Sequence, residues 1–574
     1  MTPADPPPDP LADDVTSHTL LNCLLREVCG PQRQARIEGG YVVLRLPRHD
    51  TTLRVRLRRA ALTGAHRFAG GAQVLGPAGW RPLGSQALAE AIAAELTLAH
   101  GTPNGEFADQ VRGSRELIRR FLAAAPAPAP DLDGDPTEAY LASEQALPFG
   151  HRFHPTPKAR SGSVGAALRY APEVGARFPL RLLAVRADRL AGAPADPVLD
   201  ALGTAPPGYL PLPVHPWQYA LLRGQAPLAG ALRGGDLLDL GPGGDPVVPT
   251  ASVRTVYHPA ARAFLKLSLS VRITNCVRRN APYELTGAVA LTGLLRPVAA
   301  DLARRYPGTV LLAEPAYRTA ALPGLVDSLG VIVREGLGPH LAPGVTPLLA
   351  AAVADEHGPL LPALLRRAAD RAGAGPLEWW DRYVGLLLPP VLHAYFGHGV
   401  VTEPHLQNVV VGVRDGLPAQ VFLRDLEGVK LLPPRHRALP EPVAAQVVYE
   451  PRRGFDRVVY CLLVNHLGET LARLADEHPA LERPAWQVIR QHLLRYAANH
   501  DTAEHGGTDL LRDLLAGAPL PGKANLLTRW ARLPDRSAGY LPLANPVGPY
   551  LTQSRCVHTV TNDQRRVPGP SVRA

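Results

Sequence analysis

The residue types that could bind an anion gather in one stretch of the chain, Pro249–Asn280. From Leu265 to Ile273, apolar residues alternate with polar ones. This period of two predicts a strand with one face on a core and the other in solvent. The polar face would carry an ammonium, hydroxyls and a guanidinium, from Lys266, Ser268, Ser270, Arg272 and Thr274. Such groups bind phosphate or carboxylate.

A second run, Ala251–Tyr257, precedes this strand and places Ser252 and Arg254 on one face. A histidine–proline pair then interrupts the pattern, which predicts that the two runs pair as antiparallel neighbours. Arg278 follows just beyond the strand end. Together these residues predict an anion-binding floor. The alternative is an ordinary exposed sheet face.

Another chemical cluster lies in the last third of the chain, in EPHLQNVVVGV (403–413) and VFLRDLEGVKL (421–431). The turn residues Asp415 and Gly416 between them predict a hairpin. Its ends would bring His405 and Asn408, with Glu403 close by, towards Asp425 and Glu427.

An amide oxygen with carboxylates suits Mg²⁺. In kinase-like sites an asparagine and a later aspartate hold metal on nucleotide phosphates. With the basic strands, this cluster predicts ATP binding. The alternative is a capped turn with a buried salt bridge to Arg424.

The predicted loop 143–162 carries His151, His154, Lys158 and Arg160. Together with His215, the two histidines could be zinc ligands. The neighbouring lysine and arginine would repel a cation, so contact with an anion is favoured. A near P-loop at 517–524 is rejected because a helical segment precedes it, prolines remove amide donors, and Ala524 cannot bind metal.

The totals describe a globular chain of 574 residues, for which two to four domains are expected. The net charge of +10 and the 6% aromatic content make nucleic-acid binding poorly supported. Five scattered cysteines without a CxxC pair argue against disulfides and a cysteine metal cluster. The acidic, proline-rich start is unlike a signal peptide, and apolar runs are short. We therefore expect a soluble, cytoplasmic protein.

The order of elements can be predicted from periodicity and from proline and glycine positions. The expected order is a disordered tail (1–15), a helix (16–28), two strands (41–57), helices (86–99 and 107–125), a Pro/Ala linker (123–136), helices (284–375), a last region from 379, and helices to 530.

These motifs resemble the siderophore synthetases that act without nonribosomal peptide synthetases, the IucA/IucC family. The resemblance runs from LLNCLLREV at 20–28 to the segment 523–529. Its carriers are GHRFHPTPKARSG (150–162), PVHPWQ (213–218), ASVRT (251–255), KLSLSVRITNCVR (266–278), EPHLQN (403–408) and RDLEG (424–428). The chain departs from the family pattern at Arg152 and around Pro404–Leu406.

The resemblance implies an α+β, multi-domain, cupped-hand fold. Its parts would be an N-terminal thumb (1–136), fingers built on an antiparallel sheet (137–378) and a largely helical palm (379–574), with ATP between fingers and palm.

The resemblance also implies an AMP-forming ligase that adenylates a carboxylate of citrate, or of a citrate-like acid, and passes the acyl group to an amine or hydroxyl. By similarity, the ATP ligands are His151, Lys158, Ser252, Arg254, Thr255, Lys266, Thr274, Arg278 and Asn408. The Mg²⁺ neighbours are Glu403, Asn408 and Asp425, and the catalytic residues are Lys266, Arg278 and His405, the last a candidate general base.

The expected partners are small molecules, neither nucleic acid nor membrane, and a homodimer is left open. Two other functions remain as alternatives: a kinase-like phosphotransferase, and a non-catalytic binder of a ferric siderophore.

Overall fold

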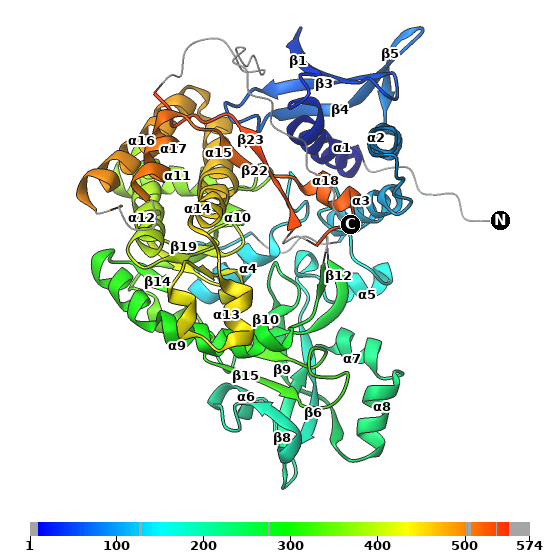
Figure 1. The fold of residues 1–574 in the computed structure, drawn as a ribbon, viewed down its shortest axis with the longest axis vertical. Helices are drawn as coiled ribbons and strands as arrows, with labels where there is room; N and C mark the ends of the chain where they lie inside the picture. The colour runs from blue at the N-terminus through cyan, green and yellow to red at the C-terminus, as the bar shows by residue number, and fades with distance from the viewer. Residues whose placement is uncertain are drawn as a thin grey trace, which may run out of the picture.

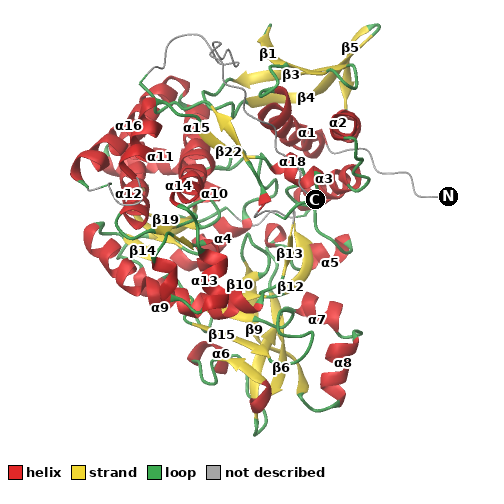
Figure 2. Ribbon diagram, viewed as in Figure 1, coloured by secondary structure: helices red, strands yellow, loops and turns green. Residues whose placement is uncertain are grey.

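A computed structural model of the chain describes residues 10–124, 129–273, 276–500, 502, 507–534 and 537–549. Figure 1 shows three groups of elements: a blue N-terminal group at the upper right, a central group of the chain, cyan to green, around a large sheet at the bottom, and a helical group on the left, yellow-green to orange. Helices and strands occur together in the fold (Figure 2), which confirms the predicted α+β class.

The N-terminal group is an antiparallel sheet, in the order β1-β2-β3-β4-β5, packed against helices. Helix α3 buries Phe107, Val111, Ser114, Leu117 and Phe121, whose spacing of three or four residues puts them on one face. The bounds are α1 Pro10–Leu24, β1 Ala35–Glu38, β2 Tyr41–Leu46, β3 Thr51–Arg59, β4 Arg67–Gly76, β5 Gly79–Leu83, α2 Ser85–His100 and α3 Phe107–Ala123. The predicted helices and strands of this part are confirmed.

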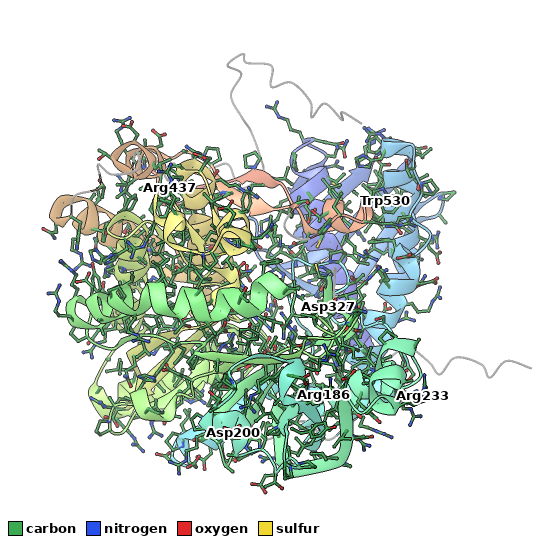
Figure 3. All side chains as sticks on the ribbon, turned by 60° about the horizontal axis from the view of Figure 1, so that its bottom comes forward. Arg186, Asp200, Arg233, Asp327, Arg437 and Trp530 are labelled. Atoms are coloured by element: carbon green, nitrogen blue, oxygen red, sulfur yellow. The ribbon has the colours of Figure 1, made fainter. Side chains whose placement is uncertain are left out.

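Both ends of this group differ in detail from expectation. Helix α1 begins at Pro10, inside the predicted tail, and residues 1–9 lie outside the described part. Helix α18 (Asn525–Trp530), from the end of the chain, completes the N-terminal core through Leu526 and Trp530. Figure 3 labels Trp530 beside the blue elements. The proposed domain boundaries at 136 and 378 stay a prediction. Helix α18 belongs to the last domain by sequence but packs in the core of the first.

The central group is built on an eight-stranded sheet in the order β7-β15-β16-β11-β10-β9-β6-β8. Its bounds are α4 Pro136–Gln145, α5 Val164–Arg169, β6 Phe178–Arg186, β7 Leu190–Gly192, α6 Pro197–Asp200, β8 Tyr209–Val214, α7 Pro216–Leu222, α8 Ala226–Arg233, β9 Leu237–Pro249, β10 Thr255–His258, β11 Ala263–Leu267, β12 Leu269–Ile273, β13 Cys276–Arg278, α9 Pro282–Arg305, β15 Ala316–Ala320 and β16 Val331–Arg334.

The predicted strand over 265–273 is two strands, not one. Strand β11 belongs to the large sheet, whereas β12 leaves it and pairs with β13. Ser268 marks the break, because its backbone N–H donates to the carbonyl of Gly330 and its hydroxyl accepts from the N–H of Asn280. The expectation of a wet polar face is also wrong for the first half: Lys266 and Ser268 are both 2% exposed.

The third group combines a four-stranded sheet, β14-β20-β19-β17, with helices. Its bounds are β14 Thr309–Leu311, β17 Thr346–Leu349, α10 Ala350–Val353, α11 Leu360–Ala372, α12 Pro376–Phe396, β18 Val400–Val401, β19 Val409–Arg414, β20 Leu417–Leu423, β21 Lys430–Leu431, α13 Glu441–Val447, α14 Pro451–Val459, a π-helix Tyr460–Leu467, α15 Gly468–Glu477, α16 Glu482–Asn499, α17 Gly507–Ala516, β22 Leu520–Lys523 and β23 Tyr540–Leu543.

The hairpin β19–β20, turning at Asp415-Gly416, confirms the sequence prediction. The expectation that 284–375 consists of helices separated by Gly/Pro-containing joints is wrong in part, because strands β14 to β17 also lie inside that range. Each of these strands has only three to five residues, too few for a period of two to stand out.

One helix of the described part, α9, is long and apolar enough to cross a membrane by length and composition. Its residues Leu291, Leu295, Val298 and Leu302 pack in a core with α13. Core helices of soluble proteins pass the same test.

His215, considered above as a zinc ligand, is the N-cap of α7: its Nδ1 accepts from the N–H of Trp217 at 3.1 Å. Burial lowers the pKa of His215 to about 3, from about 6.5 in an unfolded chain. Since only the unfolded state binds a proton here between these values, stability is lost as the pH falls from about 6.5 towards 3, by about 1.4 kcal/mol per pH unit.

The variant His215→Asn keeps a capping oxygen but removes this titration. We expect wild type to lose about 1.4 kcal/mol relative to the variant between pH 6 and pH 5. Equilibrium urea unfolding at the two pH values measures this difference. A difference that does not change with pH would contradict the assignment.

Candidate active site

Side chains from the central sheet and from the end of β20 meet in one cluster of ion pairs. The ammonium of Lys266, on β11, lies 2.6 Å from Asp425 Oδ1 and 2.7 Å from Glu427 Oε2. Arg254 donates to the same Glu427 oxygen at 2.8 Å. Thr255, next to Arg254, stands opposite Lys266 in the β10–β11 register. The basic and acidic segments predicted from the sequence therefore meet.

A third cation joins this cluster from β16, the other neighbour of β11. Arg334 Nη2 lies 3.2 Å from Asp425 Oδ1 and 2.6 Å from Glu314 Oε1. The side chain of Lys266 is only 2% exposed, whereas those of Asp425 and Glu427 are 30% and 35% exposed. The cations form the floor of the cluster, and the two acids face solvent.

The charges of this cluster stabilise one another. Burial alone would raise the pKa of Asp425, but Lys266 and Arg334 outweigh it and lower that pKa. For Glu427, Lys266 and Arg254 likewise overcome burial and lower its pKa to about 2. Asp425 and Glu427 in turn raise the pKa of Lys266 against the effect of burial. All three groups are therefore charged at neutral pH.

The turn before β10 is held in a conformation that the sequence did not predict. Residues 251–254 were expected to be strand but form a turn, and Val253 has φ = 68°. The hydroxyl of Ser252 accepts from the N–H of Thr255 at 3.1 Å. Positive φ is unusual for a β-branched residue and marks sites where strain serves function.

Glu144, on α4, connects this turn to the β20 segment. Its Oε2 accepts from the N–H of Ala251 at 2.9 Å, and its Oε1 lies 2.5 Å from Arg424 Nη1. Arg424 also donates to the carbonyl of Gln407. The salt bridge considered as the alternative for Arg424 is thus made with Glu144, which leaves Asp425 to Lys266 and Arg334.

We expect Glu144→Gln to lower the free energy of unfolding by about 3 kcal/mol, because it leaves the buried Arg424 without a counter-charge. The control is Glu138→Gln on the same helix, where the side chain is 61% exposed and pairs with Arg177. That change should stay within about 0.5 kcal/mol. Denaturant unfolding of both variants tests this. Equal losses of unfolding free energy in the two variants would show that the Glu144–Arg424 ion pair contributes nothing specific to stability.

The three predicted metal neighbours, Glu403, Asn408 and Asp425, line one small cavity. Asp425 lies at φ = 78°, a left-handed conformation that aspartate tolerates better than most residues. At Gly428 a methyl group would collide with the carboxylate of Glu403, so the missing side chain makes room for that carboxylate. Two carboxylates and an amide oxygen around a cavity are a donor set that fits Mg²⁺.

The loops that carry His151 and His405 are joined by Asn465. Its side-chain nitrogen lies 2.8 Å from His151 Nε2, and its oxygen accepts from the N–H of Leu406 at 3.3 Å. His405 is partly buried, and burial lowers the pKa of its ring, so the ring is neutral at pH 7. His151 is exposed. A neutral imidazole can accept a proton, as a general base must.

Comparisons with known proteins find two family models and several relatives that match this chain. The IucA / IucC family model matches residues 139–355, and the model of the ferric iron reductase FhuF-like transporter matches residues 377–538. The chain is 31% identical to the rhizobactin siderophore biosynthesis protein RhbC of Rhizobium meliloti, over 93% of this chain and 97% of that protein. This chain belongs to the IucA/IucC family.

Two further proteins are similar to most of this chain. It is 31% identical to the L-2,3-diaminopropanoate–citrate ligase of Staphylococcus aureus, covering 71% of this chain and 75% of that protein. ATP-bound aerobactin synthetase IucA from Klebsiella pneumoniae has the same fold, with a TM-score of 0.82 and 24% identity, covering 94% of this chain and all of that one.

Not every residue implied by the family resemblance lies in the Lys266 cluster. The ammonium of Lys158 is buried and binds Glu173 at 2.7 Å, and Arg160 shares that carboxylate. Arg278 lies on β13 opposite Leu269, two residues before Asn280, which accepts from Arg254 at 2.6 Å. Thr274 lies outside the described residues. These roles stay predictions.

Several residues of the site were not predicted from the sequence. They are Asn280, Arg334, Lys430, Arg457 and Asn465. A signal existed for Asn280, two residues after Arg278. Asn465 lies on a π-helix, and π-helices are frequent at functional sites. No sequence pattern predicts this π-helix.

Proposed function

We propose that this chain is an ATP-dependent siderophore synthetase that joins a carboxylate of citrate, or of a citrate-like acid, to an amine or hydroxyl. The observation that carries the proposal is the direct pairing of the basic strands, through Lys266 and Arg254, with the acidic turn that holds Asp425 and Glu427. Family membership supports the same reaction class. Relatives named as citrate ligases, such as the spermidine-citrate ligase of Bacillus anthracis, support citrate and an amine as substrates.

In the first step, a carboxylate oxygen of the acid attacks the α-phosphorus of ATP, and the bond to the leaving pyrophosphate breaks. Both reactants are anions, so their approach requires positive charge held in place beforehand. Arg254 and Lys266 supply it in the proposed phosphate site, with Ser252, Thr255, His151 and Lys158 as further ligands. Because Asp425 and Glu427 fix both cations, little reorganisation is needed when substrate binds.

In the second step, the amine or hydroxyl attacks the acyl carbon, and AMP leaves with the bonding electrons of the acyl–oxygen bond. His405 is the proposed base that takes the proton of the nucleophile, since its ring is neutral. Arg278 is proposed to hold a carboxylate of the acid.

Glu403, Asn408 and Asp425 are the residues that would hold Mg²⁺. When bound, Mg²⁺ neutralises phosphate oxygens. Arg457, 2.9 Å from Glu403, keeps that carboxylate at the cavity. The proposed location of the enzyme is the cytoplasm, where ATP is present.

The test is pyrophosphate release by the full chain with ATP and Mg²⁺, comparing citrate with succinate and 2-oxoglutarate, each with a panel of polyamines and amino acids. We expect release of AMP and pyrophosphate that depends on citrate. ADP instead of AMP would identify a phosphotransferase. No nucleotide turnover together with binding of a ferric siderophore would favour the non-catalytic binder.

A further inference from the structure

A second group of metal-ligating side chains lies away from the ATP site. Asp301 is on α9, His393 on α12, and His398 two residues after α12 ends. Both Nε2 atoms lie 2.9 Å from Asp301 Oδ2. Across the described residues, no other group of three His, Cys, Asp or Glu side chains brings its ligand atoms within 4.8 Å of one another.

The backbone around this group favours a cation. Helices α9, α12 and α16 end there, and their next residues are Tyr306, Gly397 and His500. Tyr306 and His500 are 3.1 Å apart through their polar atoms, and the His500 ring lies 5.9 Å from that of His393. Helix C-termini carry partial negative charge, so three of them together attract positive charge.

Gly397 gives His393 its position. A methyl group on Gly397 would stand 2.8 Å from His393 Cε1 and 3.0 Å from its Nδ1. The ring therefore packs directly against the backbone of Gly397, where a side chain would not fit. Its other nitrogen, Nε2, then faces Asp301. The ring is thereby fixed with one nitrogen directed at the group's centre.

Two positive charges near this group, those of Arg304 and Arg305, oppose the binding of a metal ion. Both arginines bind Asp301 Oδ1, at 2.5 and 3.0 Å. Their side chains are 67% and 46% exposed, and exposed ion pairs of this kind contribute little to stability. Arg305 Nε also donates to Oδ2 at 3.1 Å, the oxygen that the two histidines contact, so this exposed arginine has to turn aside when a metal ion binds there.

We propose that Asp301, His393 and His398 bind one Zn²⁺ ion, with solvent in the remaining position. Two imidazoles and a carboxylate are a common zinc ligand set with an open position. Zinc bonds of about 2.0–2.1 Å in a tetrahedron place ligand atoms about 3.3 Å apart. The two distances from Asp301 Oδ2 to the histidines, now 2.9 Å, need to change by only a few tenths of an ångström, and all three ligand atoms lie within 4.8 Å of one another.

This ion is separate from the proposed Mg²⁺ and does not depend on the proposed function. Glu284, in the first turn of α9, interacts electrostatically with Glu427 and Arg254 of the ATP site. Asp301 is seventeen residues further along the same helix, a distance of about 25 Å at 1.5 Å per residue. The zinc would join the far end of α9 to α12.

The test is calorimetric titration of the full chain with ZnCl₂ after treatment with EDTA, without nucleotide or substrate. We expect one Zn²⁺ per chain in wild type, a rise in the thermal midpoint on addition of zinc, and at least a roughly tenfold weaker affinity in His398→Gln. The matched control is His340→Gln, a histidine 33% exposed and 3.3 Å from a single carboxylate, that of Glu335, which should bind zinc as wild type does.

A second measurement uses the wild-type protein alone and so does not depend on the folding of a variant. We expect the absorption spectrum of wild type loaded with Co²⁺ to show the intense visible bands of a four- or five-coordinate ion. Absence of zinc uptake by wild type, a spectrum of hydrated Co²⁺ only, or equal affinity in His398→Gln would overturn the proposal. The group would then be a hydrogen-bonded link between α9 and α12.

Discussion

Asp425→Asn is expected to lower citrate-dependent pyrophosphate release by about 10³-fold, the scale seen when one preorganised charged group is removed from an active site. Asp425 has two tasks in the proposed mechanism. It is a neighbour of Mg²⁺, and its Oδ1 lies 2.6 Å from Lys266 and 3.2 Å from Arg334. An amide keeps the shape of the side chain but carries no charge, so Lys266 keeps only Glu427 as a carboxylate partner and Arg334 keeps only Glu314.

The assay is steady-state pyrophosphate release with ATP and citrate, beside a thermal unfolding scan to show that the variant is folded. The control is Asp415→Asn, at the opposite end of the same hairpin, where an aspartate also has positive φ (52°) and is 52% exposed. Asp415→Asn should keep activity within about twofold. Wild-type turnover by Asp425→Asn would remove Asp425 from the mechanism.

Local patterns predicted the β19–β20 hairpin and the pairing of β10 with β11 correctly. In both, two β-rich segments flank a short turn, and turn residues with period two are properties of neighbouring residues. The motif residues Lys266 and Asp425 could be named for the same reason. Their meeting could only be inferred from chemistry, since 159 positions separate them in the chain.

Other features depend on packing that no local pattern records. The burial of Lys266 arises because β10 and β16 flank β11 and the β20 end covers it. The turn at Val253 forms because Glu144 and Ser252 satisfy its amides. The Asp301 group combines side chains 92 and 97 positions apart along the chain. In each case the deciding contact is made by a residue distant in sequence, so periodicity carries no information about it.

Arg278→Ala is expected to abolish adenylation, a loss of about 10³-fold, while the protein stays folded. A guanidinium binds a carboxylate through two parallel hydrogen bonds and stays charged at all relevant pH values. Arg278 lies on the ribbon β12–β13, outside the eight-stranded sheet, so its removal leaves the main core intact. Arg278→Lys should restore only part of the activity, because an ammonium cannot make the paired contact.

The KM for citrate separates this role from a general loss of the site. If Arg278 holds the acid, the KM for citrate should rise more than that for ATP. Arg272→Ala is the matched control: Arg272 is on the paired strand β12, 46% exposed and 3.5 Å from Glu106, and its loss should change turnover less than about twofold. Full activity in Arg278→Ala, or an equal loss in Arg272→Ala, would mean that the ribbon contributes general positive charge and that the acid is held elsewhere.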